Sequence, residues 1–225
     1  MKITIINGGP RKNGATNKIL IKINENIHKE SPEAEINHIN LIDLHPAYCL
    51  GCQSCYKTGK CVITTDNMEE IHDMLEQSDG IVFGSPTYSC NVSGLFKVFH
   101  SRVHMTDEQL LFNKPCVLVT TCEITGMNKT LSLMKERVLT AGGYVSGRIG
   151  IKIPLNENPI NEENENKIDS VTKKFVKDIR RNRKPFFERF YTYIAINIFF
   201  KPFVMKNQDQ HEYVIQSWKD KGLIK

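Results

Sequence analysis

Five apolar segments recur along the chain, and a helical pattern separates each one from the next. Four of them are rich in branched residues and predict buried strands, at residues 2–7, 80–84, 115–121 and 143–153. Residues 34–39 alternate apolar and polar side chains, which indicates an edge strand. Strands joined by helices need right-handed crossovers, so the sequence predicts an α/β fold with a doubly wound, five-stranded parallel sheet and helices on both faces.

The helical patterns are typical of amphipathic helices, with apolar residues three or four positions apart. They fall at residues 15–29, 68–77, 93–104, 127–141 and 162–181. Beyond them the pattern changes to an aromatic segment, a polar break and a final helix-like stretch. We therefore expect one domain at 1–182, including a cysteine-rich loop at 46–62, and a C-terminal helical extension at 183–225.

Composition limits the classes of protein that this chain resembles. Its 225 residues, 40% hydrophobic and 24% charged, suit one globular core. Thirty Lys and Arg against 25 Asp and Glu give a formal charge of +5, which suits a phosphorylated ligand without requiring nucleic acid. The first apolar run is too short for a signal peptide, so we expect a cytoplasmic protein. In that reducing compartment, clustered thiols among the seven cysteines are expected to bind metal or do redox chemistry rather than form disulfides.

The aromatic segment between Phe186 and Met205 is the one place where a membrane span must be considered. Only eleven uncharged residues separate Arg189 from Lys201, whereas a spanning helix needs about 20. We expect no transmembrane span. The segment is instead interpreted as an apolar cover over the protein's own body or over a second subunit, with an interfacial membrane anchor as the alternative.

The loop after the first predicted strand has the chemistry of a phosphate site. Residues 7–17 read Asn-Gly-Gly-Pro-Arg-Lys-Asn-Gly-Ala-Thr-Asn, and a helix is expected to begin there. Glycines let the backbone approach a ligand, the helix N-terminus favours an anion, and Arg11, Thr16 and Asn17 offer donors. Ala15 stands where a nucleotide triphosphatase needs lysine, and the G-x-G-x-x-G pattern of dinucleotide sites is missing.

Two further loops should meet the same edge of the sheet, because ligands bind beyond the carboxyl ends of parallel strands. Residues 84–94 contain Ser-Pro-Thr-Tyr before a helix, where Tyr88 can stack on a flat ring while Ser89 and Asn91 hydrogen-bond its edge. Residues 120–126 offer a third set of polar groups.

The G-x-P-R-x-x-G-x-T loop together with S-P-T-Y before a helix resembles the NADPH-dependent FMN reductase branch of the flavodoxin-like superfamily, over about residues 1–153. Gly9 departs from the serine common in that family. The resemblance implies FMN, with its phosphate in the first loop and its ring in the other two. The implied cofactor-binding residues are Gly9, Arg11, Asn13, Thr16, Asn17, Pro86, Thr87, Tyr88, Ser89, Asn91, Thr121, Cys122, Glu123 and Gly126.

Four cysteines lie close together in a C-x2-C-x2-C-x5-C pattern at Cys49, Cys52, Cys55 and Cys61. Four thiolates in one compact loop suit an iron–sulfur cluster, with Gly51 and Gly59 easing the turns. The spacing resembles that of the iron–sulfur flavoproteins, which implies a [4Fe-4S] cluster. A structural zinc site, a redox dithiol of Cys52 and Cys55, or an empty loop are the alternatives.

The other candidate residues are weaker. Cys90, Cys116 and Cys122 are interpreted as isolated thiols, and His100 and His104, four residues apart, as packing or surface residues because no third ligand is near in sequence.

The sequence therefore predicts an FMN-dependent oxidoreductase in which NAD(P)H reduces the flavin and the electrons pass to a quinone, a free flavin or a protein acceptor. No catalytic side chain is predicted, because the flavin performs that chemistry. An electron carrier without nicotinamide activity and a zinc-binding, non-enzymatic module remain alternatives. We also expect a homodimer or higher homo-oligomer, small-molecule donors and acceptors, and no nucleic acid.

Overall fold

The computed structural model describes residues 1–154 and 157–225. Its centre is an all-parallel sheet with strand order β2-β1-β3-β4-β5. The strands are β1 (Lys2–Asn7), β2 (Glu35–Asn40), β3 (Gly80–Gly84), β4 (Pro115–Cys122) and β5 (Tyr144–Lys152). All five predicted strands are present, with ends within two residues of the expected ones. The predicted flavodoxin-like fold class is confirmed.

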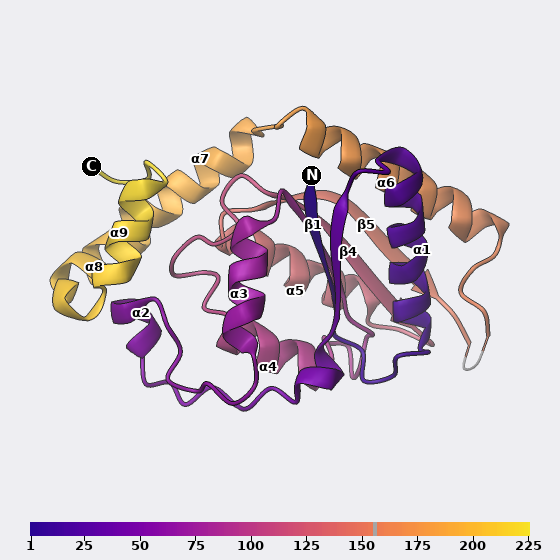
Figure 1. Cartoon of the computed structure of the whole chain (residues 1–225), viewed down its shortest axis with the longest axis horizontal. Helices are drawn as coiled ribbons and strands as arrows, with labels where there is room; N and C mark the ends of the chain where they lie inside the picture. The colour runs from indigo at the N-terminus through magenta and orange to yellow at the C-terminus, as the bar shows by residue number, and fades with distance from the viewer. Residues whose placement is uncertain (155–156) are drawn as a thin grey trace.

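Helices cover both faces of this sheet, as Figure 1 shows. One face packs against α1 (Ala15–Glu30) and α6 (Glu162–Arg180), whose buried residues join one apolar cluster with the sheet. The other packs against α3 (Met68–Gln77), α4 (Gly94–Arg102) and α5 (Met127–Thr140). Because both faces are covered, every residue of β4 is buried, whereas β2 is an edge strand with mostly half-buried side chains.

Short helical segments lie in the connection between β2 and α3, which the sequence presented only as a cysteine-rich loop. They are η1 (Leu41–Leu44) and α2 (Ser54–Thr58). Gln53 and Gly59 flank α2, and both have positive φ angles. The loop therefore turns sharply before and after its third cysteine, Cys55.

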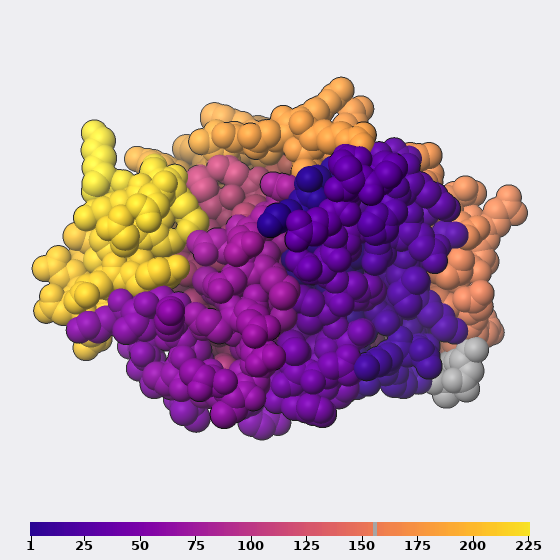
Figure 2. Space-filling model, viewed as in Figure 1, coloured from indigo at the N-terminus to yellow at the C-terminus, as the bar shows by residue number. Residues whose placement is uncertain are grey.

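The chain ends in a helical extension made of α7 (Phe186–Ile194), the π-helical η2 (Ala195–Phe200), α8 (Lys201–Lys206), η3 (Gln208–Gln210) and α9 (Glu212–Asp220). Ile196, Val204, Val214 and Trp218 form a small apolar core, with Tyr56 of α2 packed against it. Figure 2 shows the yellow end of the chain lying against the purple residues around α2. We propose that the extension is an appendage of the 1–182 domain, because Tyr56 of that domain packs against the apolar core of the extension.

No helix in the described part of the chain is long and apolar enough to cross a membrane.

Candidate functional site

A pocket lies at the carboxyl edge of the sheet, where the loops after β1, β3, β4 and β5 meet. The loop after β1 is held by two close contacts. Gly8 donates its N–H to the carbonyl of Gly84 at 2.7 Å, and Ser93 Oγ donates to the Gly8 carbonyl at 2.5 Å. A Cβ on Gly8 would lie 2.7 Å from the ring of Phe96 on α4. Only glycine therefore lets the loop after β1 lie this close to the loop and helix that follow β3.

The N-terminus of α1 opens into this pocket. Gly14 is the N-cap residue, so no side chain caps the helix, and its first turn holds no acidic residue. The free N–H groups and the positive end of the helix dipole therefore face a pocket that Arg11, Thr16 and Lys18 also line. This arrangement favours an anion such as a phosphate group.

Hydroxyl groups join the segments that follow β1 and β3 to the end of β4. Thr16 Oγ1 lies 2.8 Å from Thr121 Oγ1, and Thr87 Oγ1 lies 3.0 Å from Thr120 Oγ1. The Thr87 N–H also donates to the Thr121 carbonyl at 2.8 Å. Three segments that are far apart in sequence are thereby held in one rigid rim, as a preformed ligand pocket requires.

The loop that follows Tyr88 closes on itself. Tyr88 and Asn91 exchange backbone hydrogen bonds of 2.9 and 3.0 Å, and Ser89 and Cys90 between them have φ angles of 50° and 61°. Two successive positive φ angles make this a tight type I′ turn. Gly126 (φ 94°) packs against it, since a Cβ there would lie 2.6 Å from the Cα of Cys90.

Ten of the fourteen predicted cofactor-binding residues line the pocket. They are Gly9, Arg11, Asn13, Thr16, Pro86, Thr87, Tyr88, Thr121, Cys122 and Glu123. Asn17 instead donates from Nδ2 to the Lys12 carbonyl and contacts His38, and the Asn91 side chain accepts from the Val92 N–H. Ser89, Asn91 and Gly126 shape the rim without lining the pocket described here.

The structure also adds residues that the sequence analysis missed. Lys18 lies one turn into α1, and Ile153, Pro154 and Glu157 follow β5. The rule that ligands bind beyond the carboxyl ends of strands applies to the fifth strand as well as to the other three, so the loop after β5 could have been identified.

The four clustered cysteines line a second pocket, together with Ser101 and Arg102 from the end of α4. Cys49 and Cys52 are exposed, and Cys55 and Cys61 are half-buried. Burial, with a smaller contribution from Asp107, raises the pKa of the Cys55 thiol to about 12. The described residues that line this pocket are all different from those that line the first one.

Arg102 holds both ends of the cysteine loop. Its guanidinium donates to the carbonyls of Ala47 at 2.9 Å and Ile63 at 3.3 Å, and to Asp66 at 2.5 and 3.0 Å. Its Nε is buried and has no hydrogen-bond partner among the described residues. A buried donor without a partner, beside four cysteines, fits a site that receives an acceptor such as a sulfide or thiolate sulfur.

The cysteine sulfurs can be compared with the spacing that a single metal ion requires. Four thiolates around one zinc ion, each at about 2.3 Å, would lie about 3.8 Å from one another. Within residues 1–154 and 157–225, the groups of three donor atoms that lie within 4.8 Å of one another include none of these cysteines. The four thiols are therefore not gathered at single-ion spacing in the described residues.

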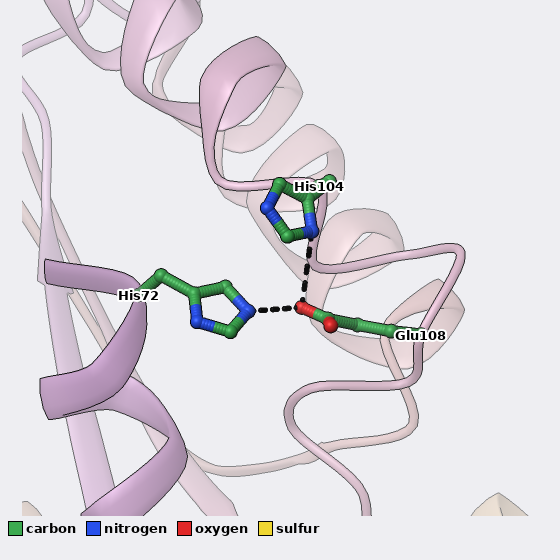
Figure 3. A group of neighbouring side chains, drawn as sticks. All are labelled: His72, His104 and Glu108. Atoms are coloured by element: carbon green, nitrogen blue, oxygen red, sulfur yellow. Dashed lines mark hydrogen bonds and ion pairs between the residues drawn. The ribbon is translucent and has the colours of Figure 1, made fainter. Parts of the chain in front are cut away.

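His72, His104 and Glu108 form a buried polar cluster (Figure 3). His72 Nε2 lies 2.5 Å from Glu108 Oε1, His104 Nδ1 lies 3.3 Å from the same oxygen, and the two imidazole rings stack with centroids 4.7 Å apart. An ion coordinated by both His72 and Glu108 would hold those two atoms more than 3 Å apart. The 2.5 Å contact therefore indicates a hydrogen-bonded ion pair. The expectation that His104 is a packing or surface residue missed both of its partners: Glu108, one turn later in the sequence, and His72, which comes from the distant α3.

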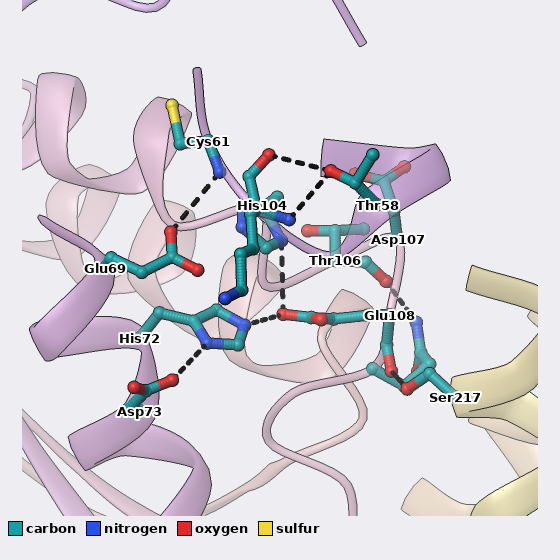
Figure 4. Close-up of polar contacts among 12 residues, drawn as sticks. Thr58, Cys61, Glu69, His72, Asp73, His104, Thr106, Asp107, Glu108 and Ser217 are labelled. Carbon is teal, nitrogen blue, oxygen red and sulfur yellow. Dashed lines mark hydrogen bonds and ion pairs between the residues drawn. The ribbon is translucent and has the colours of Figure 1, made fainter. Parts of the chain in front are cut away.

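This cluster connects the cysteine loop to the C-terminal extension (Figure 4). Ser217 Oγ donates to the Glu108 carbonyl at 2.8 Å, and Trp218 Nε1 donates to the Asp107 carbonyl at 2.7 Å. On the loop side, the Cys61 N–H donates to Glu69, one turn before His72 on α3. The network therefore fixes α9 to Asp107 and Glu108 and the cysteine loop to α3, and the contact between His72 and Glu108 joins the two.

Comparisons with known proteins agree with this architecture. Residues 1–148 match the family model described as NADPH-dependent FMN reductase. A Clostridioides difficile protein named iron–sulfur flavoprotein is 46% identical over 225 residues, the whole of both chains. An Archaeoglobus fulgidus protein of the same name is 32% identical over 162 residues, 71% of this chain and 76% of that protein.

Solved structures support the same fold. An apo NADH:FMN oxidoreductase superposes with a TM-score of 0.62 at 17% identity, covering 84% of this chain and 93% of the other. Oxidised flavodoxin 1 from Bacillus cereus gives a TM-score of 0.55 at 20% identity, over 79% and 98% of the two chains. From the matched family model and the full-length relative, this chain belongs to the NADPH-dependent FMN reductase family, in its iron–sulfur flavoprotein branch.

Proposed function

We propose that this protein is an FMN-dependent, NAD(P)H-oxidising reductase that also carries a [4Fe-4S] cluster on Cys49, Cys52, Cys55 and Cys61. The observation that supports it best is the pocket at the carboxyl edge of the sheet, where a helix N-terminus without a side-chain cap lies beside a rim that includes an aromatic side chain. The family's name and the relatives' names point to the same two cofactors.

The residues present fit FMN. Its phosphate would be held by the first-turn N–H groups of α1 with Arg11, Thr16 and Lys18, and its ring would lie along Pro86, Thr87 and Tyr88. When bound, the flavin supplies hydride acceptance and one-electron transfer. Tyr88 is 43% exposed at the rim, where it can cover one face of the ring.

Backbone N–H groups near the ring would stabilise negative charge there. Thr87, Tyr88, Asn91 and Val92 already donate their N–H groups within the protein. The amides of Ser89 and Cys90 have no hydrogen-bond acceptor in the described part of the chain. In this loop they are therefore the two N–H groups that can donate to a negatively charged ring. No side chain of the pocket is assigned as a general acid or base.

The cysteine pocket fits a cluster through its four thiols and the unpaired Nε of Arg102. That pocket borders the last turn of α4, a helix of nine residues and so about 13 Å long, whose N-terminal end adjoins the Tyr88 loop. Such a spacing suits the relay of electrons from the flavin to a protein acceptor.

A homodimer is the assembly that we propose for the active form. Tyr88 and Ile124, 43% and 76% exposed, leave an apolar rim beside the pocket that a second subunit can cover.

Anaerobic purification followed by flavin, iron and zinc analysis tests the cofactors, and steady oxidation of NADH or NADPH with a quinone or ferricyanide tests the reaction. We expect one FMN and four irons per chain, with turnover. Folded protein that takes up no FMN from excess would overturn the proposal. Full cofactor loading without nicotinamide oxidation would instead identify an electron carrier.

A further inference from the structure

The C-terminal extension exposes a concentration of apolar side chains. We call residues 181–206, which include α7, η2 and α8, the basic aromatic segment. It holds nine of the fifteen large hydrophobic side chains exposed in the described residues. Seven of these are between 53% and 80% exposed, namely Phe186, Phe187, Phe190, Tyr193, Ile198, Phe199 and Phe203. Contiguous apolar surface of this kind marks a binding site.

Only a narrow stripe of the segment packs on the protein. Thr192, Ile196 and Val204 are buried at intervals of four and eight residues, and Phe200, midway between the last two, is half-buried against the same apolar core. The exposed aromatic residues, such as Phe187 and Phe199, lie outside this stripe. The segment is thus a helical rod lying on the surface with most of its circumference free.

The net charge of the chain is located in the same segment. Residues 181–206 carry six Lys and Arg against one Glu, whereas the other 199 residues carry 24 of each sign. The +5 charge of the protein is therefore the charge of the basic aromatic segment. Arg189 and Lys206 are exposed among the aromatic residues, where long stems let the charge reach past apolar surface.

We propose that the basic aromatic segment binds parallel to the surface of a membrane that contains anionic lipids, with its phenylalanines in the boundary between headgroups and acyl chains. An exposed helix that combines aromatic residues with Lys and Arg is typical of interfacial anchors, and each basic residue near an anionic surface adds to the attraction.

A second copy of the chain is a poorer occupant. Pairing two such segments would bring two surfaces of charge +5 together, and like charges at close range oppose association. An anionic lipid surface complements the charge and covers the phenylalanines at the same time.

The segment begins at the edge of the sheet opposite the flavin pocket. Asn182 and Arg183 line another pocket with Asp79 and Pro115, which lie at the amino-terminal ends of β3 and β4. Docking through the segment would therefore leave the carboxyl edge open to small molecules. The inference does not depend on which cofactors are bound.

Sedimentation with vesicles tests the proposal. The full-length protein is mixed with vesicles of phosphatidylglycerol and phosphatidylcholine in equal parts, or of phosphatidylcholine alone. We expect binding to the anionic vesicles that weakens with added salt, and at least tenfold less binding to the neutral ones. Retained FMN uptake and an unchanged circular dichroism spectrum show that each variant is folded.

Two variants and one matched control separate the contributions. Phe187→Ser with Phe199→Ser should lower the partition coefficient at least tenfold, through lost apolar burial. Arg189→Gln with Lys206→Gln should lower it about fivefold for each charge removed. Lys129→Gln with Lys135→Gln removes two exposed charges from α5 and should leave binding unchanged.

Absence of binding to anionic vesicles overturns the proposal. So does binding that the phenylalanine and charge variants leave intact. A dimer in solution that the phenylalanine variant dissociates would also overturn it, because the segment would then be covered by a second copy.

Discussion

Arg102 and Asp66 form a buried, bidentate ion pair beneath the cysteine pocket, with Nη1 to Oδ2 at 2.5 Å and Nη2 to Oδ1 at 3.0 Å. Burial alone would raise the pKa of Asp66, but the hydrogen bonds and charge of Arg102, together with the backbone N–H groups of Ala47 and Met68, lower that pKa. Asp66 also accepts the N–H of Ala47, so one carboxylate fixes the start of the cysteine loop directly and both ends through Arg102.

Replacing Asp66 with Asn should remove about 3 to 5 kcal/mol from the free energy of unfolding, because a buried guanidinium loses its counter-charge. Loss of this ion pair should also lower the iron bound per chain after anaerobic reconstitution. Urea unfolding and iron analysis measure the two effects. Asp169→Asn breaks an exposed ion pair with Lys173 and should cost no more than about 0.5 kcal/mol, with full iron content. Equal costs at the two sites would contradict the conclusion that Asp66 and Arg102 hold the ends of the cysteine loop.

The His72, His104 and Glu108 cluster predicts a pH window for stability. Burial would raise the pKa of Glu108, but hydrogen bonds from His104 and His72 lower it to about 2. Burial would lower the pKa of His72, but its contact with Glu108 raises it above 6.5. The carboxylate therefore stabilises the fold above pH 4.5 and loses that effect as the pH falls toward 2. The imidazolium stabilises it fully below pH 6.5 and loses that effect as the pH rises through the raised pKa.

The difference in unfolding free energy between the wild type and Glu108→Gln should consequently be largest between about pH 4.5 and 6.5. Denaturant titrations across pH 3 to 9 measure it, with exposed His28→Gln as the control that should show no such maximum. A difference that stays constant over this range would show that Glu108 acts by packing alone.

The sequence was sufficient for the sheet because period and composition are local properties of each strand, and the parallel arrangement follows from the helices between them. The loop after β1 was also predictable, since glycines directly before a helix are typical of a site that binds phosphate at the helix N-terminus. The position of Asn17 was not, because its amide is occupied by Lys12 and His38, and the second of these comes from β2.

The cluster of His72, His104 and Glu108 shows most clearly what could not be predicted from the sequence. His104 and Glu108 are a turn apart in sequence, but His72 reaches them only when α3 packs beside residues 104–108. The contact between α9 and α2 is equally non-local, since Tyr56 stacks on His211 and Lys57 pairs with Glu212. Neither relationship has a periodic signal, so both required the tertiary structure.

Gly59 should be the least replaceable glycine of the cysteine loop. It has a φ of 73°, and a Cβ there would lie 2.5 Å from the ring of Tyr213 on α9. Gly59→Ala should lower the free energy of unfolding by about 1 kcal/mol for the backbone and by a further 1 to 3 kcal/mol for displacing Tyr213. Gly222→Ala, at φ 66° with no atom within 4 Å, should show the backbone cost alone. Thermal unfolding of both variants measures the difference, and equal losses would mean that α9 does not pack on the loop.

Lys18 should distinguish the phosphate end of the pocket from the ring end. It lies one turn into α1, lines the pocket with Arg11, and adds positive charge where the helix dipole is already positive. Lys18→Ala should weaken FMN about fivefold while leaving riboflavin, which has no phosphate, unchanged. Flavin fluorescence titrations measure both affinities, and the FMN effect should shrink with added salt. Lys29→Ala removes the same charge from the far end of α1, about 16 Å away, and should change neither affinity. If Lys18→Ala weakens riboflavin as much as FMN, the phosphate does not lie at this helix.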